Sequence, residues 1–202
     1  MKKTILLFVF LFFGVISFSQ NENGRQIQTL VGNQRISSGG YGAVSFYYSK
    51  ISGEDVLLIG GKGGWIINHK LCLGLAGYGF VNDLEFDDLI DGKSLNLSGG
   101  YGGLLIEPII SPYDPIHVSV PLLIGAGGIT YFENNWWKNK AYPSKAFFVF
   151  EPGVELELNI IRFMRIALGV SYRLTSNIGI ENIDSKNLDG FSGGITLKFG
   201  KF

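Results

Sequence analysis

Apolar and polar residues alternate along most of the chain, most clearly in two stretches, 154–160 and 164–175, that a short break separates. From Met164 to Leu174 every second residue is apolar, and the residues between them are Arg, Ala, Gly or Ser. A period of two is the mark of a β-strand with one face in an apolar medium and the other in a polar one. The two stretches therefore predict a β-hairpin that turns at 161–163.

The same reading along the chain after residue 38 predicts eight strand-like segments in all. They cover 40–50, 55–67, 70–81, 94–107, 116–132, 146–160, 164–175 and 190–202. Each is at least as long as the roughly 9 to 11 residues with which a tilted strand crosses a bilayer. Eight such strands predict an all-β, antiparallel, up-and-down barrel.

The chemistry of the two faces indicates which one points outward. The polar phase is mostly Gly, Ala and Ser with sparse charges, whereas a strand face in water would be expected to carry Lys, Thr and Glu. The apolar phase is too bulky for the inside of eight strands; it includes Phe46, Tyr48, Leu57, Ile59, Trp65, Leu71, Leu73, Leu75, Val118, Val120, Leu122, Ile124 and Phe199. We therefore expect lipid outside and small or polar residues inside; a soluble lipocalin-like barrel is the alternative.

The connections alternate in length, as they do in transmembrane β-barrels with short periplasmic turns and longer outside loops. Residues 68–69, 111–115 and 161–163 are short links, and 82–93, 133–145 and 176–189 are longer ones. The link 51–54 is the exception, because it is short where a long loop is expected. This alternation places both chain ends in the periplasm.

Glycine and aromatic residues are both abundant, with 29 Gly, 16 Phe, 9 Tyr and 3 Trp. Glycine relieves crowding in a narrow barrel and lets rings lie over the neighbouring strand. We expect two aromatic belts. One holds Tyr47, Tyr48, Tyr78, Phe80, Tyr131, Phe132, Phe147, Phe148, Phe150, Tyr172 and Phe191, and the other holds Trp65, Phe163, Phe199 and Phe202.

The last strand ends on an aromatic residue. Ile195, Leu197 and Phe199 share one face, and Phe202 falls in the other phase unless the strand end bulges. This ending resembles the assembly signal of bacterial outer-membrane barrels, so Phe199 and Phe202 are its candidate residues. The mature chain resembles the small Gly-rich outer-membrane barrels of Bacteroidota, which implies a place in the outer membrane of a Gram-negative bacterium and insertion by the barrel-assembly machinery.

The N-terminal residues have the pattern of a secretory signal peptide. A basic start, an apolar run over 5–16 and small residues before Gln20 predict a signal peptide over 1–19. We expect a periplasmic tail over 20–38 and the barrel over 39–202. The 17 Lys and Arg balance the 17 Asp and Glu, so no basic surface points to nucleic acid.

Charged residues in the inward phase are candidates for a lumen cluster: Lys62, Glu151, Glu155, Glu157, Arg165 and Arg173. A symmetric turn centred on Ile161 would place Glu157 opposite Arg165. Charges in a narrow lumen must be paired. We expect salt bridges that plug the barrel, because eight strands leave room only for side chains; a conducting or gated pore is the alternative.

Catalysis is not expected from this sequence. Outer-membrane enzymes that modify lipid A act near the outer leaflet and need a histidine with a serine partner. His69 and His117 each begin a strand on the periplasmic side, so we interpret both as turn or rim residues. We predict no catalytic residue, no cofactor and no metal site.

The long loops are where contacts with partners are expected. Loop 82–93 is acidic but does not have the spacing of an EF-hand; weak divalent-ion bridging to lipopolysaccharide is the alternative to a solvated loop. The contact candidates in the next long loop are Trp136, Trp137, Lys138 and Tyr142, which fit anionic head groups or a glycan, or simply extend the aromatic belt. Outer-membrane lipids and lipopolysaccharide are the expected partners.

Two classes of function remain open. The first is a structural or interaction barrel that anchors the envelope or presents its surface loops. The second is a small-solute pore or a lipid-handling barrel.

Overall fold

The computed structural model describes residues 37–51, 54–82, 95–133, 145–176 and 188–202. These residues form β1 (Ser38–Ile51), β2 (Glu54–Ile67), β3 (Leu71–Asn82), β4 (Leu95–Ile110), β5 (Ile116–Ser119), β6 (Leu122–Glu133), β7 (Lys145–Ile161), β8 (Met164–Thr175) and β9 (Gly190–Lys201). Among them, no helix is long and apolar enough to cross a membrane. The expected signal peptide, and the expected tail up to residue 36, lie outside the described residues.

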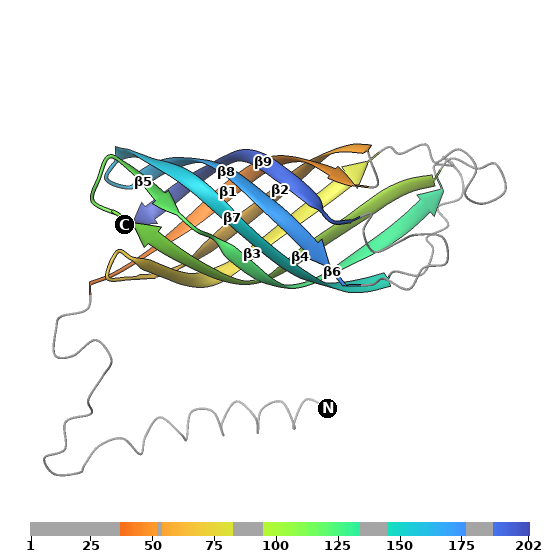
Figure 1. Ribbon diagram of the computed structural model, residues 1–202, viewed down its shortest axis with the longest axis horizontal. Helices are drawn as coiled ribbons and strands as arrows, with labels where there is room; N and C mark the ends of the chain where they lie inside the picture. The colour runs from red at the N-terminus through yellow and green to blue at the C-terminus, as the bar shows by residue number, and fades with distance from the viewer. Residues whose placement is uncertain (1–36, 52–53, 83–94, 134–144, 177–187) are drawn as a thin grey trace, which may run out of the picture. The chain divides into compact units, whose positions relative to one another are not determined.

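The strands close into a ring (Figure 1). Apart from β5 and β6, which do not pair with each other, successive strands pair antiparallel, and β1 also pairs with β9, which joins the first strand to the last. The short β5 and the longer β6 share one place in the wall, because both lie between β4 and β7. The prediction of an eight-stranded antiparallel barrel is therefore confirmed, with one strand in two pieces.

Proline explains the break between β5 and β6, where the sequence predicts one strand over 116–132. Pro121 has no N–H to donate to a ladder, so regular pairing stops at Val120 and Pro121. The chain is held there by single backbone bonds, from the Val120 N–H to the Pro108 carbonyl at 2.9 Å and from the Gly153 N–H to the Pro121 carbonyl at 2.8 Å. The wall continues through the break in the same inward and outward phase.

The two ends of the barrel differ in their connections. We call the end with the links 68–70, 111–115 and 162–163 the turn end; β1 begins and β9 ends there (Figure 1). The short links use left-handed backbone at non-glycine residues, with φ of 51° at Asn68, 59° at His69 and 54° at Ser111. The other connections lie at the opposite end, the loop end, and 52–53, 83–94, 134–144 and 177–187 fall outside the described residues.

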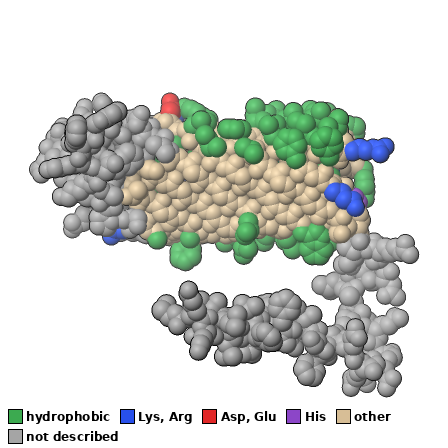
Figure 2. Space-filling view, turned by 180° about the vertical axis from the view of Figure 1, so that it is seen from behind, with side chains coloured by type: hydrophobic (Ala, Val, Ile, Leu, Met, Phe, Trp, Pro, Cys, Tyr) green, Lys and Arg blue, Asp and Glu red, His purple; other side chains and the backbone are tan. Residues whose placement is uncertain are grey.

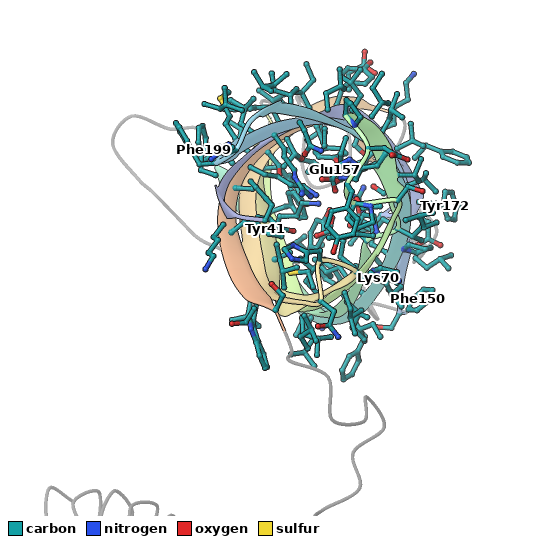
Figure 3. The ribbon with its side chains drawn as sticks, turned by 90° about the vertical axis from the view of Figure 1, so that its left-hand side faces the viewer. Tyr41, Lys70, Phe150, Glu157, Tyr172 and Phe199 are labelled. Atoms are coloured by element: carbon teal, nitrogen blue, oxygen red, sulfur yellow. The ribbon has the colours of Figure 1, made fainter. Side chains whose placement is uncertain are left out.

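Burial alternates along the strands as the sequence pattern predicts. In β1, Phe46 and Tyr48 are 44% and 53% exposed, whereas Tyr47 between them is 5% exposed. Seen from the turn end, Tyr41 and Glu157 point into the ring, and Phe150, Tyr172 and Phe199 point away from it (Figure 3). Apolar side chains lie along the outside of the barrel (Figure 2). The inner and outer faces are thus correctly predicted.

The expected aromatic belts need correction. Phe80 and Phe147 are each 4% exposed and Tyr47 is 5% exposed, so these rings lie inside the barrel and not on its outer rim. Tyr78 packs against the same interior cluster. These four residues lie at the predicted height along the barrel. They are not part of the outer belt, because they occupy inward-facing positions of their strands. Phe148, at 74% exposure, and the Tyr172–Phe191 pair, with ring centroids 4.7 Å apart, remain outside at the loop end.

The interior of the loop-end half is apolar. The sequence analysis predicted small or polar residues inside the barrel and did not predict these apolar side chains. The side chains that pack together there are Tyr47, Ile51, Val56, Leu58, Ala76, Phe80, Tyr101, Leu105, Leu123, Ile129, Phe147, Val149 and Leu188. Glycine makes room for the rings: a Cβ on Gly127 would lie 2.5 Å from the ring of Phe147. Aromatic and aliphatic bulk therefore fills this half of the lumen.

Candidate functional site

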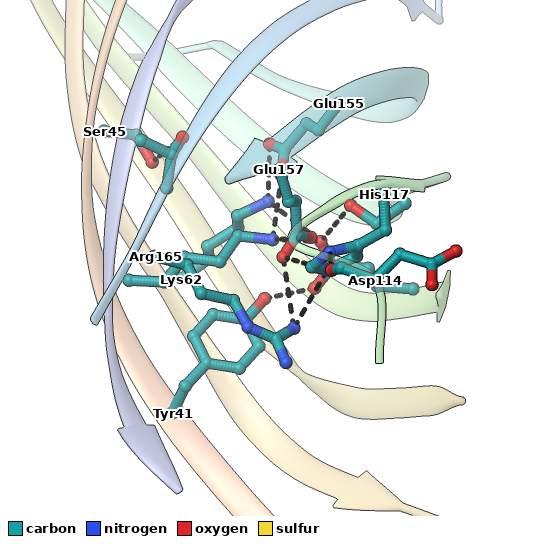
Figure 4. A network of polar contacts seen from close by, with 12 residues as sticks. Tyr41, Ser45, Lys62, Asp114, His117, Glu155, Glu157 and Arg165 are labelled. Atoms are coloured by element: carbon teal, nitrogen blue, oxygen red, sulfur yellow. Dashed lines mark hydrogen bonds and ion pairs between the residues drawn. The ribbon is translucent and has the colours of Figure 1, made fainter. Parts of the chain in front are cut away.

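The turn-end half of the lumen holds a cluster of buried charges, to which almost every wall strand contributes (Figure 4). Its ionisable side chains are Lys62 of β2, Glu107 of β4, His117 of β5, Glu155 and Glu157 of β7, Arg165 of β8 and Lys198 of β9. All are at most 5% exposed. Each falls on an inward position of its strand, so the alternation of the strands itself brings the charges together. We call this set the lumen network.

Lys198 is the centre of the lumen network. Its Nζ lies 2.6 Å from Glu107 Oε1, 2.6 Å from Glu157 Oε1 and 2.9 Å from Glu155 Oε2. Lys62 makes a second bridge, with Nζ 2.6 Å from Glu155 Oε1 and 3.3 Å from Glu107 Oε1. Two ammonium groups thus hold three carboxylates together in a space closed to solvent.

Arg165 and His117 close the lumen network toward the turn end. Arg165 Nη1 lies 3.3 Å from Glu157 Oε2, and the guanidinium stands 4.0 Å above the ring of Phe202. His117 Nδ1 lies 3.2 Å from the backbone carbonyl of Asp114, which can only accept, so Nδ1 carries the proton. Nε2 lies 3.2 Å from both Glu157 Oε2 and Arg165 Nη1.

Neutral hydroxyl groups add hydrogen bonds to Glu107 and Glu155. Tyr41 donates to Glu107 Oε2, Tyr47 donates to Glu155 Oε1 at 3.0 Å, and Ser119 donates to Glu107 Oε1 at 3.0 Å. Three permanent cations, Lys62, Arg165 and Lys198, stand beside the three carboxylates. Buried charges are stabilised by pairing and hydrogen bonds. In the lumen network each charge has an ion-pair partner, although Glu155 Oε2 and Arg165 Nε have no hydrogen-bond partner among the described residues.

Two of the six charges expected in one cluster lie nearer the loop end. Glu151 accepts from Ser171 Oγ at 2.6 Å, and its other oxygen has no hydrogen-bond partner among the described residues. Arg173 donates to the Leu188 carbonyl at 2.8 Å, to Ser49 Oγ at 3.3 Å and to Tyr101 Oη at 3.4 Å. The structure therefore brings Lys62, Glu155, Glu157 and Arg165 together and places Glu151 and Arg173 apart from them.

The expected register of the β7–β8 hairpin is wrong. Glu157 pairs with Ala167 and Arg165 pairs with Asn159, because the turn consists of Arg162 and Phe163 and the ladder is irregular between Asn159 and Ile161. The pairing moves by two residues, and an even shift leaves every side chain on its original face. Arg165 accordingly still reaches Glu157, but diagonally.

Sequence reasoning missed three members of the lumen network. Glu107 and Lys198 both lie in the inward phase of their strands, so extending the same alternation to β4 and β9 would have found them. His117 was expected at the rim, but it is 3% exposed and lies within the network. His69 lies in the turn between β2 and β3, with its ring 5.4 Å from that of Tyr113.

A lysine occupies the place in the lumen network where the carboxylates come closest together. Carboxylate oxygens of Glu107, Glu155 and Glu157 lie within 4.8 Å of one another, as metal ligands do. The Lys198 ammonium is already bound to all three, so the position of a cation is filled. In the described part of the chain, no serine hydroxyl is hydrogen-bonded to a histidine, which a serine nucleophile would require.

A small cavity separates the lumen network from the apolar half. It measures about 20 Å³ and is lined by Tyr47, Lys62, Tyr78, Leu123, Glu151 and Glu155, among others. A water molecule needs roughly 10–15 Å³ of such volume, so the cavity is of the size of one or two waters.

Other candidate residues fall in different places. Phe199 is 45% exposed on the outer face, and Phe202 stacks on Tyr41 inside the barrel with ring centroids 6.0 Å apart. The ending thus divides its two aromatic residues between the faces, as the phase predicts. Trp136, Trp137, Lys138 and Tyr142 lie outside the described residues, as does the acidic loop over 82–93 apart from Asn82.

Comparison with known proteins supports the fold. No family model and no curated protein matches the chain. Among solved structures, the barrel is similar to Neisserial surface protein A, with a TM-score of 0.55 and 10% identity over 84% of this chain and 100% of that one. Outer membrane protein OprG from Pseudomonas aeruginosa (TM-score 0.46, 13% identity, 81% of this chain, 94% of that one) and Ail, the attachment invasion locus protein of Yersinia pestis (0.45, 10%, 81% and 97%), are more distant. The first of these similarities shows that the chain has the fold of a small eight-stranded barrel.

Proposed function

We propose that this chain is an outer-membrane β-barrel with a structural or interaction role. We further propose that its lumen is sealed, unlike the lumen of a pore. The observation that carries the proposal is the filling of the lumen in two layers. Apolar side chains pack the loop-end half, and paired charges close the turn-end half. A barrel filled in this way offers its surface and its loops, and not its interior, to partners.

The outer face supports the membrane placement. Large apolar side chains stand exposed on strand after strand, among them Leu75 at 64%, Leu104 at 62% and Val170 at 61%. Soluble proteins rarely leave apolar surface of such extent in contact with water. We infer that lipid covers this face, with the turn end in the periplasm and the loops outside the cell, and that outer-membrane lipids, lipopolysaccharide and the barrel-assembly machinery are the partners. The glycine-rich composition fits the Bacteroidota barrels that the sequence resembles.

No enzymatic role is part of this proposal. His117 contacts the Asp114 carbonyl, Glu157 and Arg165 inside the turn end. The small-solute pore remains the alternative, and it would require the lumen network and the apolar layer to move together.

The membrane placement is tested by fractionating cells that express the full chain and running the membrane fraction on gels with and without boiling. We expect the protein in the outer membrane, and we expect boiling to change its mobility, because a closed barrel resists detergent until it is heated. A protein recovered in buffer without detergent, with one mobility in both lanes, would contradict the proposal.

A further inference from the structure

Exposed cations lie along one half of the turn-end rim. Lys70 follows β2 in the turn to β3, Arg162 lies in the turn between β7 and β8, and Lys201 is the last residue of β9. All three are exposed. Figure 2 shows Lys and Arg side chains at this end of the barrel, beyond the apolar ones. We call these three residues the basic arc.

The basic arc spans four neighbouring strands, β8, β9, β1 and β2, which make up half of the wall. The β9 strand lies between β8 and β1, and β1 lies between β9 and β2. The Gly200 N–H donates to the Phe163 carbonyl at 3.0 Å, which ties the end of β9 to the turn that carries Arg162. The Asn68 N–H donates to the Ser37 carbonyl at 2.9 Å, which ties the turn before Lys70 to the start of β1. Lys201 therefore lies between the other two cations along the rim, and Arg162 and Lys70 stand at the two ends of this half.

Each cation lies beyond an exposed aromatic ring on the same sector. Trp65, Phe163 and Phe199 are 53%, 58% and 45% exposed on the outer face. Lys201 and Trp65 are both in register with Gly40 of β1, from opposite sides, so their backbones lie about two strand spacings, or roughly 10 Å, apart. Gly40 between them has no side chain to separate the lysine stem from the indole.

The opposite wall of the turn end lacks this arrangement. The turn 111–115 and the start of β5 carry no Lys or Arg, and Asp114 is exposed there. In the described residues, Asp114 is the only side-chain carboxylate exposed at the turn end. The charge is thus unevenly distributed around the rim.

From this asymmetry we infer that the basic arc is a binding surface for the phosphate of an anionic glycerophospholipid, and that it concentrates such lipids on one side of the barrel. Aromatic rings prefer the level of the lipid head groups, and Lys and Arg extend their stems along apolar surface to place a charge in the phosphate layer. A cation near an anionic lipid surface contributes about a fivefold preference. The inference rests on the proposed membrane placement.

Quenching of tryptophan fluorescence by brominated lipids measures this lipid preference separately at the basic arc and at the opposite part of the rim. In a variant with Trp136→Phe and Trp137→Phe, Trp65 is the single tryptophan and reports on the basic arc. Adding Trp65→Phe and Ile116→Trp moves the reporter to β5, across the ring, where Ile116 is 58% exposed on the outer face. Each protein is placed in equimolar phosphatidylglycerol and phosphatidylcholine, with bromine on the chains of one lipid or the other.

We expect Trp65 to meet phosphatidylglycerol at least about threefold more often than phosphatidylcholine, and the reporter at position 116 to show no preference. The variant Lys70→Gln, Arg162→Gln, Lys201→Gln should bring the ratio at Trp65 to about one. If that variant does not fold, Lys201→Gln alone should lower the ratio, and 1 M salt should lower it in the unaltered arc.

Equal ratios at the two reporters, or a preference that survives the glutamine variants, would overturn the inference. A preference for the phosphates of lipid A without one for phosphatidylglycerol would also overturn it, because the arc would then face the other leaflet. Absence of quenching by either brominated lipid has a different meaning: it would contradict the membrane placement itself.

Discussion

Replacing Lys198 with methionine should destabilise the barrel by about 3–5 kcal/mol, which is the usual cost of removing one partner from a buried ion pair. Methionine keeps most of the volume of lysine, so the decrease in the free energy of unfolding reflects the removal of the ammonium charge. Without the ammonium, Glu107, Glu155 and Glu157 lose the group that contacts all three of them. The free energy of unfolding, measured by urea titration in lipid vesicles, gives the value.

A control on the same strand shows how much of the effect depends on the buried position of the lysine. Lys201→Met also removes a lysine from β9, but at an exposed position, and it should change the free energy of unfolding by no more than about 0.5 kcal/mol. Adding Glu107→Gln to Lys198→Met restores the balance of charge and should recover part of the loss. Equal effects of the two methionine variants would mean that the lumen network contributes nothing to stability.

Replacing Leu75 with arginine should cost about 2–4 kcal/mol if β3 faces lipid near the middle of the bilayer. Leu75 lies near the centre of β3, is 64% exposed and pairs with Gly63 and Leu104. In a barrel surrounded by water the same substitution would remove apolar surface from solvent and cost almost nothing. The sign and size of the change therefore discriminate between lipid and water outside the barrel.

Tyr113→Arg is the matched comparison for this prediction. Tyr113 is 75% exposed in a turn at the end of the barrel, where an arginine reaches water. Its effect should stay within about 0.5 kcal/mol in vesicles. A cost at Tyr113 as large as that at Leu75 would point to misfolding and not to depth in the membrane.

The fold and the inner and outer faces could be predicted from sequence because a strand has a period of two. Each charged residue of the lumen network lies at an inward-facing position of its strand. The turns keep the inward and outward positions in step from one strand to the next. Even the error in the β7–β8 register left Glu157 and Arg165 on the inner face, since the pairing moved by two residues. Face membership is thus more robust than pairing.

The contacts within the lumen could not be predicted in the same way. They depend on which strands lie across the ring from one another and on the height of each residue along the barrel. Lys62 and Glu155 are 93 positions apart in sequence and meet at 2.6 Å. The position of His117 depends on the turn before it, because the Asp114 carbonyl holds Nδ1 inside the barrel. The sequence analysis assigned too many residues to the aromatic belts because it used only their height along the barrel. Phe147 and Phe148 lie at nearly the same height, but Phe147 is inside the barrel and Phe148 is outside.

The central claim is that two layers of side chains seal the lumen, and recording ionic current through single refolded barrels in a planar bilayer tests it most directly. We expect no reproducible current steps from the full-length protein in 1 M KCl, because apolar packing and paired charges fill the interior. Reproducible steps whose size changes in Glu155→Gln would show that ions pass through the lumen network, and would contradict a sealed barrel.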